Sequence, residues 1–421
     1  MKVAVFEYLS GGGLINDANS PSRAPRSRRS GLQQPKTSMR TTELLEPLYL
    51  EGLSMLTALA TDLAFCGHEV HTCLDRKAAV DPMVESLLQQ FSGLQVHKID
   101  CPWLDRWIDV ALACDRTIVI APELHQHLER IINALRTAGA AVIASSTSFI
   151  QATSDKLKTA KLLTDSGVPH PRTQSLTQYR LGFTEPEALA DSLRRGSASA
   201  SGSSRSVNHG RKSQTAYLSE WDKEQPVTLK RRDGAGCADM KVFADPRKLT
   251  EWLRTPESHD LAGEEWIIQP WQPGIPASLA LIADDDAWTV LGAAEQQIEL
   301  ASESNHCGYA YVSYLGGTGP LRRVSLERLE HLAMRVRDSL PLGAKGWIGI
   351  DFLIPDEMQG SQNLVVIEIN PRLTTSYLGY RRWYGHALAN SLVGNVNCSE
   401  LKPKTICQTS EPSSWDCIAT R

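Results

Sequence analysis

Apolar residues in the first 145 positions fall into short runs that alternate between two spacings. Runs rich in β-branched residues predict strands at Val3–Tyr8, Glu69–Leu74, Arg116–Ala121 and Ala141–Ala144. Apolar residues at helical spacing predict helices at Tyr49–Phe65 and Pro122–Ala138. This alternation indicates a mainly parallel sheet with helices on both faces. Ligands of such sheets gather at the carboxyl ends of strands, so the glycines at 11–13 are either a turn or a ligand contact.

Two segments and the C-terminus depart from this pattern. Residues 16–41 hold three prolines and a cluster of four arginines, and residues 192–215 are rich in serine and glycine. Neither segment has enough apolar surface to order itself, so both are expected to be exposed, mobile insertions. Contact of the arginines with RNA is the less common alternative. The tail from residue 397 is expected to be loosely held.

Two apolar segments in the second half of the chain carry side chains that bind metals. Trp347–Ile354 contains Asp351, and Val365–Arg372 contains Glu368 and Asn370. A charge in a strand core is costly unless it is paired or bound to a metal. Glu368 and Asn370 are two residues apart and project from one face, and Asp351 on a neighbouring antiparallel strand would complete an all-oxygen site for Mg²⁺. Carboxylates satisfied by an arginine or by backbone donors are the alternative interpretation.

A further segment has the residues of a phosphate-binding loop. Lys230 ends a predicted strand and is followed by Asp233, Gly234 and Gly236. Glycines let backbone N–H groups approach a phosphate, and a lysine supplies charge. The spacing is neither that of a Walker A loop nor that of a Rossmann fingerprint. Upstream, Lys156 lies at the start of a helix that Thr153 or Ser154 is expected to cap.

Composition narrows the class of protein. The length of 421 residues suits two or three domains, and 42% hydrophobic with 22% charged residues is ordinary for a globular enzyme. The formal net charge of −4 gives no argument for nucleic acid or an anionic membrane. The sequence has no run of 18 apolar residues that would predict a membrane span. Nine cysteines without CxxC spacing fit free thiols in a reducing cytoplasm rather than a zinc site.

The order of these elements resembles the ATP-grasp superfamily over roughly residues 110–390. The resemblance implies a mixed α/β and α+β fold, in which an N-terminal parallel-sheet (pre-ATP-grasp) domain precedes two α+β lobes that enclose ATP. The implied parts are residues 1–145, 146–270 with the glycine-rich flap, 271–396 with the metal site, and the tail 397–421.

Carried over to this sequence, the resemblance also assigns roles to individual residues. Lys156 and Lys230 would hold the α- and β-phosphates of ATP, and the segment from Asp233 through Gly234 and Gly236 to Cys237 would cover the triphosphate. The hinge from Gln269 to Gln272 would meet adenine. Asp351, Glu368 and Asn370 would bind Mg²⁺, with Mn²⁺ as an alternative, and Arg372 would act with Lys230 in catalysis by steadying the γ-phosphate or an acyl phosphate. Gln269 and Ser278 stand where many members have the glutamates that meet the hinge and the ribose.

A narrower resemblance rests on four segments, Phe6–Gly13, Glu51–Leu56, Asp233–Cys237 and Ile369–Tyr377. They are similar to the tyramine–glutamate ligase group of methanofuran biosynthesis. That likeness implies a cytoplasmic ligase that joins a small carboxylate to an amine through an acyl phosphate, commonly as a homodimer, without nucleic acid or membrane partners. A ligase for another amino acid or peptide, and a non-catalytic ATP-binding regulatory protein, remain alternatives. Tyr377, Arg381 and Arg382 are either substrate contacts or packing residues.

Overall fold

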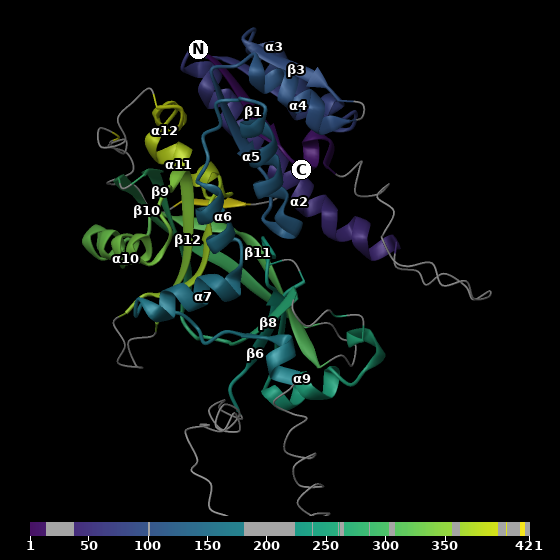
Figure 1. Cartoon of the computed structure of the whole chain (residues 1–421), viewed down its shortest axis with the longest axis vertical. Coiled ribbons are helices and arrows are strands. Elements are labelled where there is room, and N and C mark those ends of the chain that lie inside the picture. Colours follow the sequence, from purple (N-terminus) through teal and green to yellow (C-terminus); the bar gives the residue numbers. More distant parts are fainter. Residues whose placement is uncertain are drawn as a thin grey trace, which may run out of the picture.

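The computed structural model describes residues 1–13, 38–99, 102–180, 224–237, 239–259, 261, 265–285, 287–302, 308–355, 363–394, 401 and 413–416. The segment 192–215 and most of 16–41 lie outside these residues, so the predictions about these insertions stay predictions. The described chain folds around two sheets, a small parallel one and a large antiparallel one. In Figure 1 the parallel sheet and its helices occupy the upper part of the molecule, and the lobe with β6, β8 and α9 lies at the lower end.

The N-terminal sheet is fully parallel and has the strand order β3-β2-β1-β4. Its strands are β1 (Lys2–Glu7), β2 (Glu69–Leu74), β3 (Leu94–Lys98) and β4 (Arg116–Ile120). Its helices are α2 (Ser38–Phe65), α3 (Pro82–Gln90), α4 (Trp103–Leu112) and α5 (His127–Thr137). Alternate residues of β1 enter different cores, because successive strand side chains point to opposite faces. Val3 and Val5 pack with α2, whereas Ala4 and Phe6 pack with α4 and α5.

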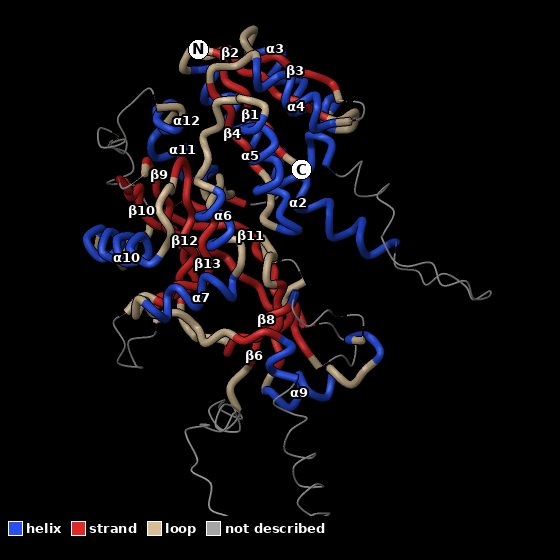
Figure 2. The backbone as a smooth tube through the Cα atoms, in the orientation of Figure 1, coloured by secondary structure: helices blue, strands red, loops and turns tan. Residues whose placement is uncertain are grey.

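The second sheet has ten strands and antiparallel pairing throughout, in the order β13-β12-β9-β10-β11-β7-β6-β8-β5, with β14 added beside β11. The strands are β5 (Gln174–Ser175), β6 (Val227–Arg231), β7 (Lys241–Phe243), β8 (Trp266–Pro270), β9 (Ile275–Asp284), β10 (Ala287–Ser302), β11 (Tyr309–Gly319), β12 (Lys345–Ile354), β13 (Val365–Asn370) and β14 (Ser413–Asp416). The helices of this part are α6 (Thr147–Thr153), α7 (Lys156–Asp165), α9 (Pro246–Trp252), α10 (Leu326–Ser339), α11 (Tyr377–Tyr384) and α12 (Ala387–Leu392). Figure 2 shows this sheet running through the middle of the molecule to its lower end.

The large sheet is covered on both faces, and its central strands are apolar on both sides as a result. Leu279 and Leu281 of β9 join the core formed with α7 and α10. Ala280 and Ile282 of the same strand join a core that contains α11, α12 and α2. Helix α2 therefore packs on the parallel sheet and on the helices of the large sheet, and one continuous core links the two parts of the chain.

Residues Leu48–Phe65 of α2 are long and apolar enough to cross a membrane by length and composition, although 61% of this segment is buried inside the protein. A core helix passes the same test, and the packing of α2 between the two parts of the chain is that of a core helix. The segment is therefore only a weak indication of a membrane span.

Three expectations about local structure were wrong. Helix α2 begins at Ser38, inside the segment predicted as an insertion. Residues 141–144 form a single bridge between Val142 and Thr117 instead of a strand. Within the predicted loose tail, of which residue 401 and residues 413–416 are described, Ser413–Asp416 are held as β14, where Trp415 is 3% exposed and packs against Gly317, Gly379 and Trp383. The sequence around Trp415 is short and polar, so it carries no strand signal of its own, and the buried indole is what holds it.

Candidate nucleotide and metal site

A cavity of about 340 Å³ lies between the lobe of β6 and β8 and the strands β12 and β13. Such a volume falls in the range of sites for small molecules and cofactors. Its wall combines apolar residues of β10 and β11 with a polar end that carries lysines and carboxylates. Seven of the residues predicted for ATP or metal binding line it, namely Lys156, Lys230, Gly234, Gln269, Gln272, Asp351 and Glu368.

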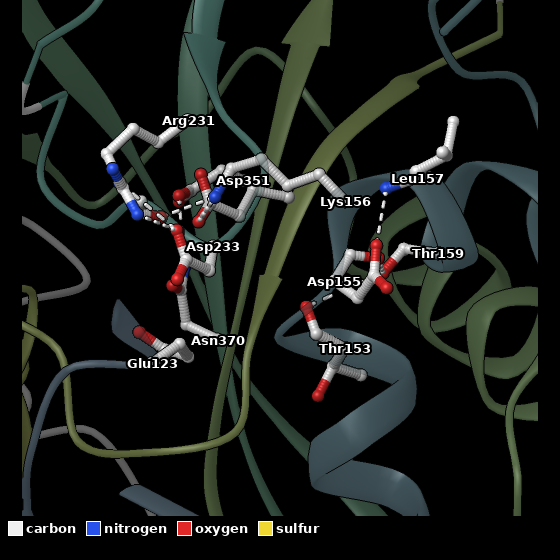
Figure 3. A network of polar contacts seen from close by, with 12 residues as sticks. Glu123, Thr153, Asp155, Lys156, Leu157, Thr159, Arg231, Asp233, Asp351 and Asn370 are labelled. Carbon is white, nitrogen blue, oxygen red and sulfur yellow. Dashed lines mark hydrogen bonds and ion pairs between the residues drawn. The ribbon is translucent and has the colours of Figure 1, made fainter. Parts of the chain in front are cut away.

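Lys156 reaches the polar end of the cavity from the first turn of α7. The helix is capped by Asp155, whose Oδ1 accepts hydrogen bonds from the backbone N–H groups of Leu157 (3.1 Å) and Lys158 (3.2 Å). These two bonds make Asp155 the N-cap, in place of Thr153 or Ser154. Arg232 also holds the Asp155 carboxylate, with hydrogen bonds of 2.6 and 2.7 Å. The Lys156 ammonium lies 2.9 Å from Glu368 and also donates to the carbonyl of Gly234. Figure 3 shows this side chain extending from α7 toward Asp351.

Asp351 and Glu368 face each other across β12 and β13, as the prediction of neighbouring antiparallel strands requires. Asp351 accepts hydrogen bonds from the side-chain amides of Gln296 and Asn370, both at 3.1 Å. Burial and then the nearby Glu368 carboxylate raise the pKa of Asp351 to about 6. Asp351 keeps some surface because it faces the cavity, but protein surrounds it on its other sides. Lys156 is paired with Glu368, so no cation at hydrogen-bond distance is left for Asp351 among the described residues.

This donor set fits a magnesium ion. Two carboxylates and the amide oxygen of Asn370 are hard ligands, and the raised pKa of Asp351 marks a place where a cation would be stabilising. Among the described residues, no group of three or more His, Cys, Asp or Glu side chains is arranged to hold a metal. An ion at this place would therefore take its third protein ligand from Asn370.

Lys230 is the second lysine of the site, and it lies on β6 with 6% of its surface exposed. Burial lowers the pKa of its ammonium to about 8, although the Glu368 carboxylate acts in the opposite direction. The ammonium donates no hydrogen bond to any residue in the described ranges, and its side chain borders the cavity. A buried cation without a hydrogen-bonded partner is suited to an anionic ligand.

The loop after β6 closes over Lys156, and Gly236, Cys237 and Asp239 in it have positive φ angles. Gly236 has φ 63° and Cys237 has φ 61°, a conformation that costs the cysteine strain. Burial raises the pKa of the Cys237 thiol to about 12, so it is a poor nucleophile at neutral pH. Asp233 does not line the cavity. It pairs with Arg231 at 3.1 Å and accepts a hydrogen bond of 2.9 Å from the backbone of His125 in the N-terminal part.

The segment predicted to meet adenine begins at Gln269 on β8. Its side chain is 6% exposed and donates a hydrogen bond of 2.8 Å to Thr173. Gln272 and Gly274 also border the cavity. Gly274 has φ 147°, and a Cβ atom there would lie 2.7 Å from the carbonyl oxygen of Ile354, so only glycine fits where this hinge meets the end of β12.

Arg372 lies just outside the cavity wall, at the junction with the N-terminal part. Its Nε donates to both carboxylate oxygens of Glu123, at 2.9 and 3.0 Å. The side chains are 12% and 4% exposed. Glu123, Glu51 and Glu368 together raise the pKa of Arg372 against the effect of its burial. Its Nη2 group donates no hydrogen bond to a described residue.

Tyr377 and Arg381 do not contact the cavity, and the alternative that they are packing residues is correct. The Tyr377 hydroxyl donates to Asp62 of α2 at 2.7 Å, and Arg381 donates to the same carboxylate at 2.6 and 2.8 Å. Arg382 is exposed and donates to the carbonyl of Ser414. The glycines at 11–13 are likewise buried in packing against Trp107, Trp103 and Tyr8, which makes them a tight turn.

Three residues of the site were not identified from sequence. Glu123 follows the carboxyl end of β4, which is where ligand-binding residues of parallel sheets lie, so this position was a usable signal. Glu51 is a charge inside an apolar helix, but nothing in the sequence says what it meets. Gln296 is a polar residue within the long strand β10, and its contact with Asp351 depends on a fold of the chain that no local pattern reports.

Comparisons with known proteins agree with this arrangement. The family model for the ATP-grasp domain matches residues 153–376, and the model for the pre ATP-grasp 3 domain matches residues 76–150. No curated protein sequence matches the chain.

The solved structures named here have similar folds and are distant in sequence. An ATP-grasp superfamily protein from Archaeoglobus fulgidus has 19% identity and a TM-score of 0.52, over 96% of this chain and 90% of that one. The L-amino acid ligase from Bacillus licheniformis has 12% identity and a TM-score of 0.51, over 96% and 77%. The biotin carboxylase domain of 2-oxoglutarate carboxylase from Hydrogenobacter thermophilus, a dimer in complex with MgADP, has 12% identity and a TM-score of 0.53, over 81% and 67%. These likenesses concern the fold alone.

Proposed function

The chain belongs to the ATP-grasp family and has the fold expected of it, and from this premise we propose that it is an ATP-dependent ligase that joins a carboxylate to an amine. One observation carries the proposal. Two buried lysines and a carboxylate pair, brought from α7, β6, β12 and β13, converge on one cavity. The lysines suit the phosphates of ATP, and the carboxylates suit the metal ion that accompanies it.

The residues of the chain divide this task between them. Lys156 and Lys230 would contact the α- and β-phosphates, and Gly234 and Gly236 would let the loop lie close over the triphosphate. Gln269 and Gln272 would meet adenine at the hinge. Magnesium, when bound by Asp351, Glu368 and Asn370, would neutralise phosphate charge and align the terminal phosphate. Lys230 is expected to depend more on the phosphate than Lys156 does, because its ammonium has no hydrogen-bond partner among the described residues.

The reaction would proceed in two steps. A carboxylate oxygen of the acid forms a bond to the γ-phosphorus while the bond from that phosphorus to the bridging oxygen of ADP breaks, which leaves an acyl phosphate and ADP. The amine nitrogen then bonds to the acyl carbon, the carbon–oxygen bond to phosphate breaks, and the nitrogen loses a proton. Arg372 would steady the transferring phosphate through its free Nη2, and closure of the 233–237 loop would exclude water that hydrolyses the acyl phosphate.

The substrate pair we favour is glutamate with tyramine or a similar amine, as in methanofuran-type carrier biosynthesis. Support for this finer assignment comes from the four similar sequence segments alone. Cytoplasmic location and a homodimer belong to the same assignment and rest on the same likeness.

The test is release of ADP and phosphate from Mg–ATP with L-glutamate and a panel of primary amines that includes tyramine, with the amide identified by mass spectrometry. Tyramine-dependent ADP release with γ-glutamyltyramine as product is the expected result. Coupling of another acid and amine would keep the ligase and discard the favoured pair. ATP binding without turnover on a broad panel of acids and amines would overturn the ligase proposal in favour of a regulatory ATP-binding protein.

A further inference from the structure

Helix α2 brings one of its faces to the edge of the candidate site. Positions 48, 51 and 62 share this face at helical spacing. Leu48 lies against the loop after β6, because a Cβ atom at Gly236 would be 3.3 Å from its methyl group. At the other end, Asp62 is bound by α11. Glu51 lies between these two contacts, where α2, the 233–237 loop and the segment after β13 meet.

The surroundings of Glu51 confirm this placement from three directions. Its carboxylate is hydrogen-bonded to the side chain of Thr375 and lies in the field of Arg372. Its charge also reaches the thiol of Cys237 in the loop. Arg372 in turn lies in the field of Glu368, one of the predicted metal ligands. Glu51 is therefore close to the place where the terminal phosphate of ATP is proposed to lie, on the side that faces the N-terminal part.

Among the described residues, no lysine or arginine forms an ion pair with Glu51, in contrast to the other carboxylates of this junction. Arg372 donates its Nε hydrogen bond to both oxygens of Glu123, and Lys156 is paired with Glu368. Within the described residues, Thr375 is the hydrogen-bond partner that remains for Glu51. Glu51 is partly exposed, but protein surrounds most of the carboxylate, and this desolvation raises its pKa in spite of Arg372 and Thr375. A partly buried carboxylate in this condition is suited to a positively charged ligand.

A carboxylate–amine ligase needs such a ligand at such a place. The acid substrate and ATP are anionic, whereas a primary amine is a cation before it reacts. We propose that Glu51 is the acceptor-binding residue, whose carboxylate holds the ammonium group of the amine substrate at the junction of α2, the 233–237 loop and Arg372. The inference rests on the proposed ligase function and names the site of its second substrate.

The test separates the acid half of the reaction from the amine half. Hydroxylamine is a small, largely neutral nucleophile that traps an acyl phosphate as a hydroxamate, so hydroxamate formation reports on acid and ATP without the amine site. In the variant Glu51→Gln we expect the KM for the amine to rise at least tenfold. The KM values for ATP and for L-glutamate and the rate of hydroxamate formation should each change by less than threefold. Glu51→Asp, which keeps the charge, should retain more of the amine affinity than Glu51→Gln.

A purely structural role for Glu51 predicts different results. A structural role would make Glu51→Gln less stable. The proposal instead predicts an unchanged or higher melting temperature for Glu51→Gln, because burial works against the charged form of Glu51. The matched control is Asp62→Asn, which removes a carboxylate from the same helix face. It should lower the melting temperature without a selective rise in the KM for the amine. An unchanged KM for the amine in Glu51→Gln, or a loss of stability with equal changes in all three KM values, would overturn the inference.

The proposed function can fail separately. No hydroxamate from wild-type protein with any acid of a broad panel would overturn the ligase itself. Hydroxamate without an amide from any amine of the panel would overturn the amine acceptor and the role of Glu51 with it. If Glu51→Gln does not fold, the same KM comparison in Glu51→Asp decides the question, with a rise of at least threefold for the amine alone as the expected result.

Discussion

Two buried polar networks join distant parts of this chain, and they differ in how completely their charges are paired. The network at Asp62 is closed. That carboxylate is 1% exposed and accepts hydrogen bonds of 2.6 to 2.8 Å from Tyr377, Arg381 and His386. The cluster at the cavity is open. Lys230 donates no hydrogen bond to a described residue, and Asp351 faces a like charge, Glu368, across the strands.

The difference separates structure from function. A charge that is moved from water into protein must recover its lost hydration, and the Asp62 network does so with protein groups. The cavity cluster recovers it only in part. As a result the pKa of Lys230 is lowered and the pKa of Asp351 is raised, and both shifts favour the neutral form of the side chain. Incomplete pairing beside a cavity is what a site for a charged ligand requires. Both networks combine carboxylates with basic side chains, so residue type alone does not tell them apart.

The largest expected effect comes from breaking the open cluster. Lys230→Ala and Glu368→Gln should each lower ligase turnover by about 10³-fold or more, because each removes charge that is aimed at the phosphates or the metal. Lys230→Ala should not lose stability, since burial opposes the charge of Lys230. Glu368→Gln should keep the fold but lose some stability, because it removes the counter-charge of Lys156. Turnover and denaturant unfolding are the measurements. Normal ligase rates in either variant would show that the site is misassigned.

Breaking the closed network should have the reverse outcome. Asp62→Asn leaves Arg381, whose side chain is 29% exposed, without its counter-charge and should destabilise the fold by about 3 kcal/mol, the lower end of the range for breaking a buried ion pair. Urea unfolding of the variant and wild type measures this loss. At a temperature where the variant is still folded, its KM for ATP should equal that of the wild type. A variant as stable as the wild type would mean that Arg381 finds water or another partner and that the network is not the anchor described.

The sequence predicted the secondary structure of the site well because the site lies on strongly patterned strands. Asp351 and Glu368 were placed on neighbouring antiparallel strands, and the register pairs them directly. Such strands are nearly continuous apolar runs, so a carboxylate within them is conspicuous. The parallel N-terminal sheet followed from its strand and helix alternation for the same reason.

What the sequence could not provide is which charges are paired across the chain. Arg381 was a candidate substrate contact, but it meets Asp62, 319 positions away. Asp233 was expected over the triphosphate and instead binds Arg231 and the backbone of His125. These contacts depend on how α2 docks on α11 and on the loop after β6. No local periodicity encodes that docking.

Glu7 sharpens the comparison, because it accepts hydrogen bonds but pairs with no cation among the described residues. It accepts from the backbone N–H groups of Leu9 and Ser10 and from the Ser10 hydroxyl, at 2.6 to 3.0 Å. Burial nevertheless raises its pKa from 4.5 to about 7. The folded state therefore keeps the proton between these values while the unfolded chain loses it, so the Glu7 contribution to stability falls as pH rises through this window, by up to about 3 kcal/mol.

The measurement is the difference in unfolding free energy between wild type and Glu7→Gln at pH 5 and at pH 8. The variant does not titrate at this position, so the wild type should lose up to about 3 kcal/mol relative to it as the pH is raised. Other carboxylates titrate alike in both proteins and cancel. A difference that is independent of pH would show that three hydrogen bonds are enough to hold the Glu7 charge, and that a counter-charge is not the deciding factor.

The smallest change in stability and activity is expected for Arg382→Ala, although a large loss of stability is expected at the adjacent Arg381. Arg381 and Arg382 are adjacent on α11, yet Arg382 is exposed and donates to the carbonyl of Ser414 instead of to a buried carboxylate. Arg382→Ala should change stability by no more than about 0.5 kcal/mol and leave the KM values for ATP, acid and amine unchanged. Parallel thermal melts and steady-state kinetics of Arg382→Ala and Arg381→Ala give the contrast directly, with Arg381→Ala showing the loss predicted for Asp62→Asn. A rise in the KM of any substrate in Arg382→Ala would restore this residue as a substrate contact. It would also mean that exposure at the surface is not a sufficient criterion for separating the two arginines.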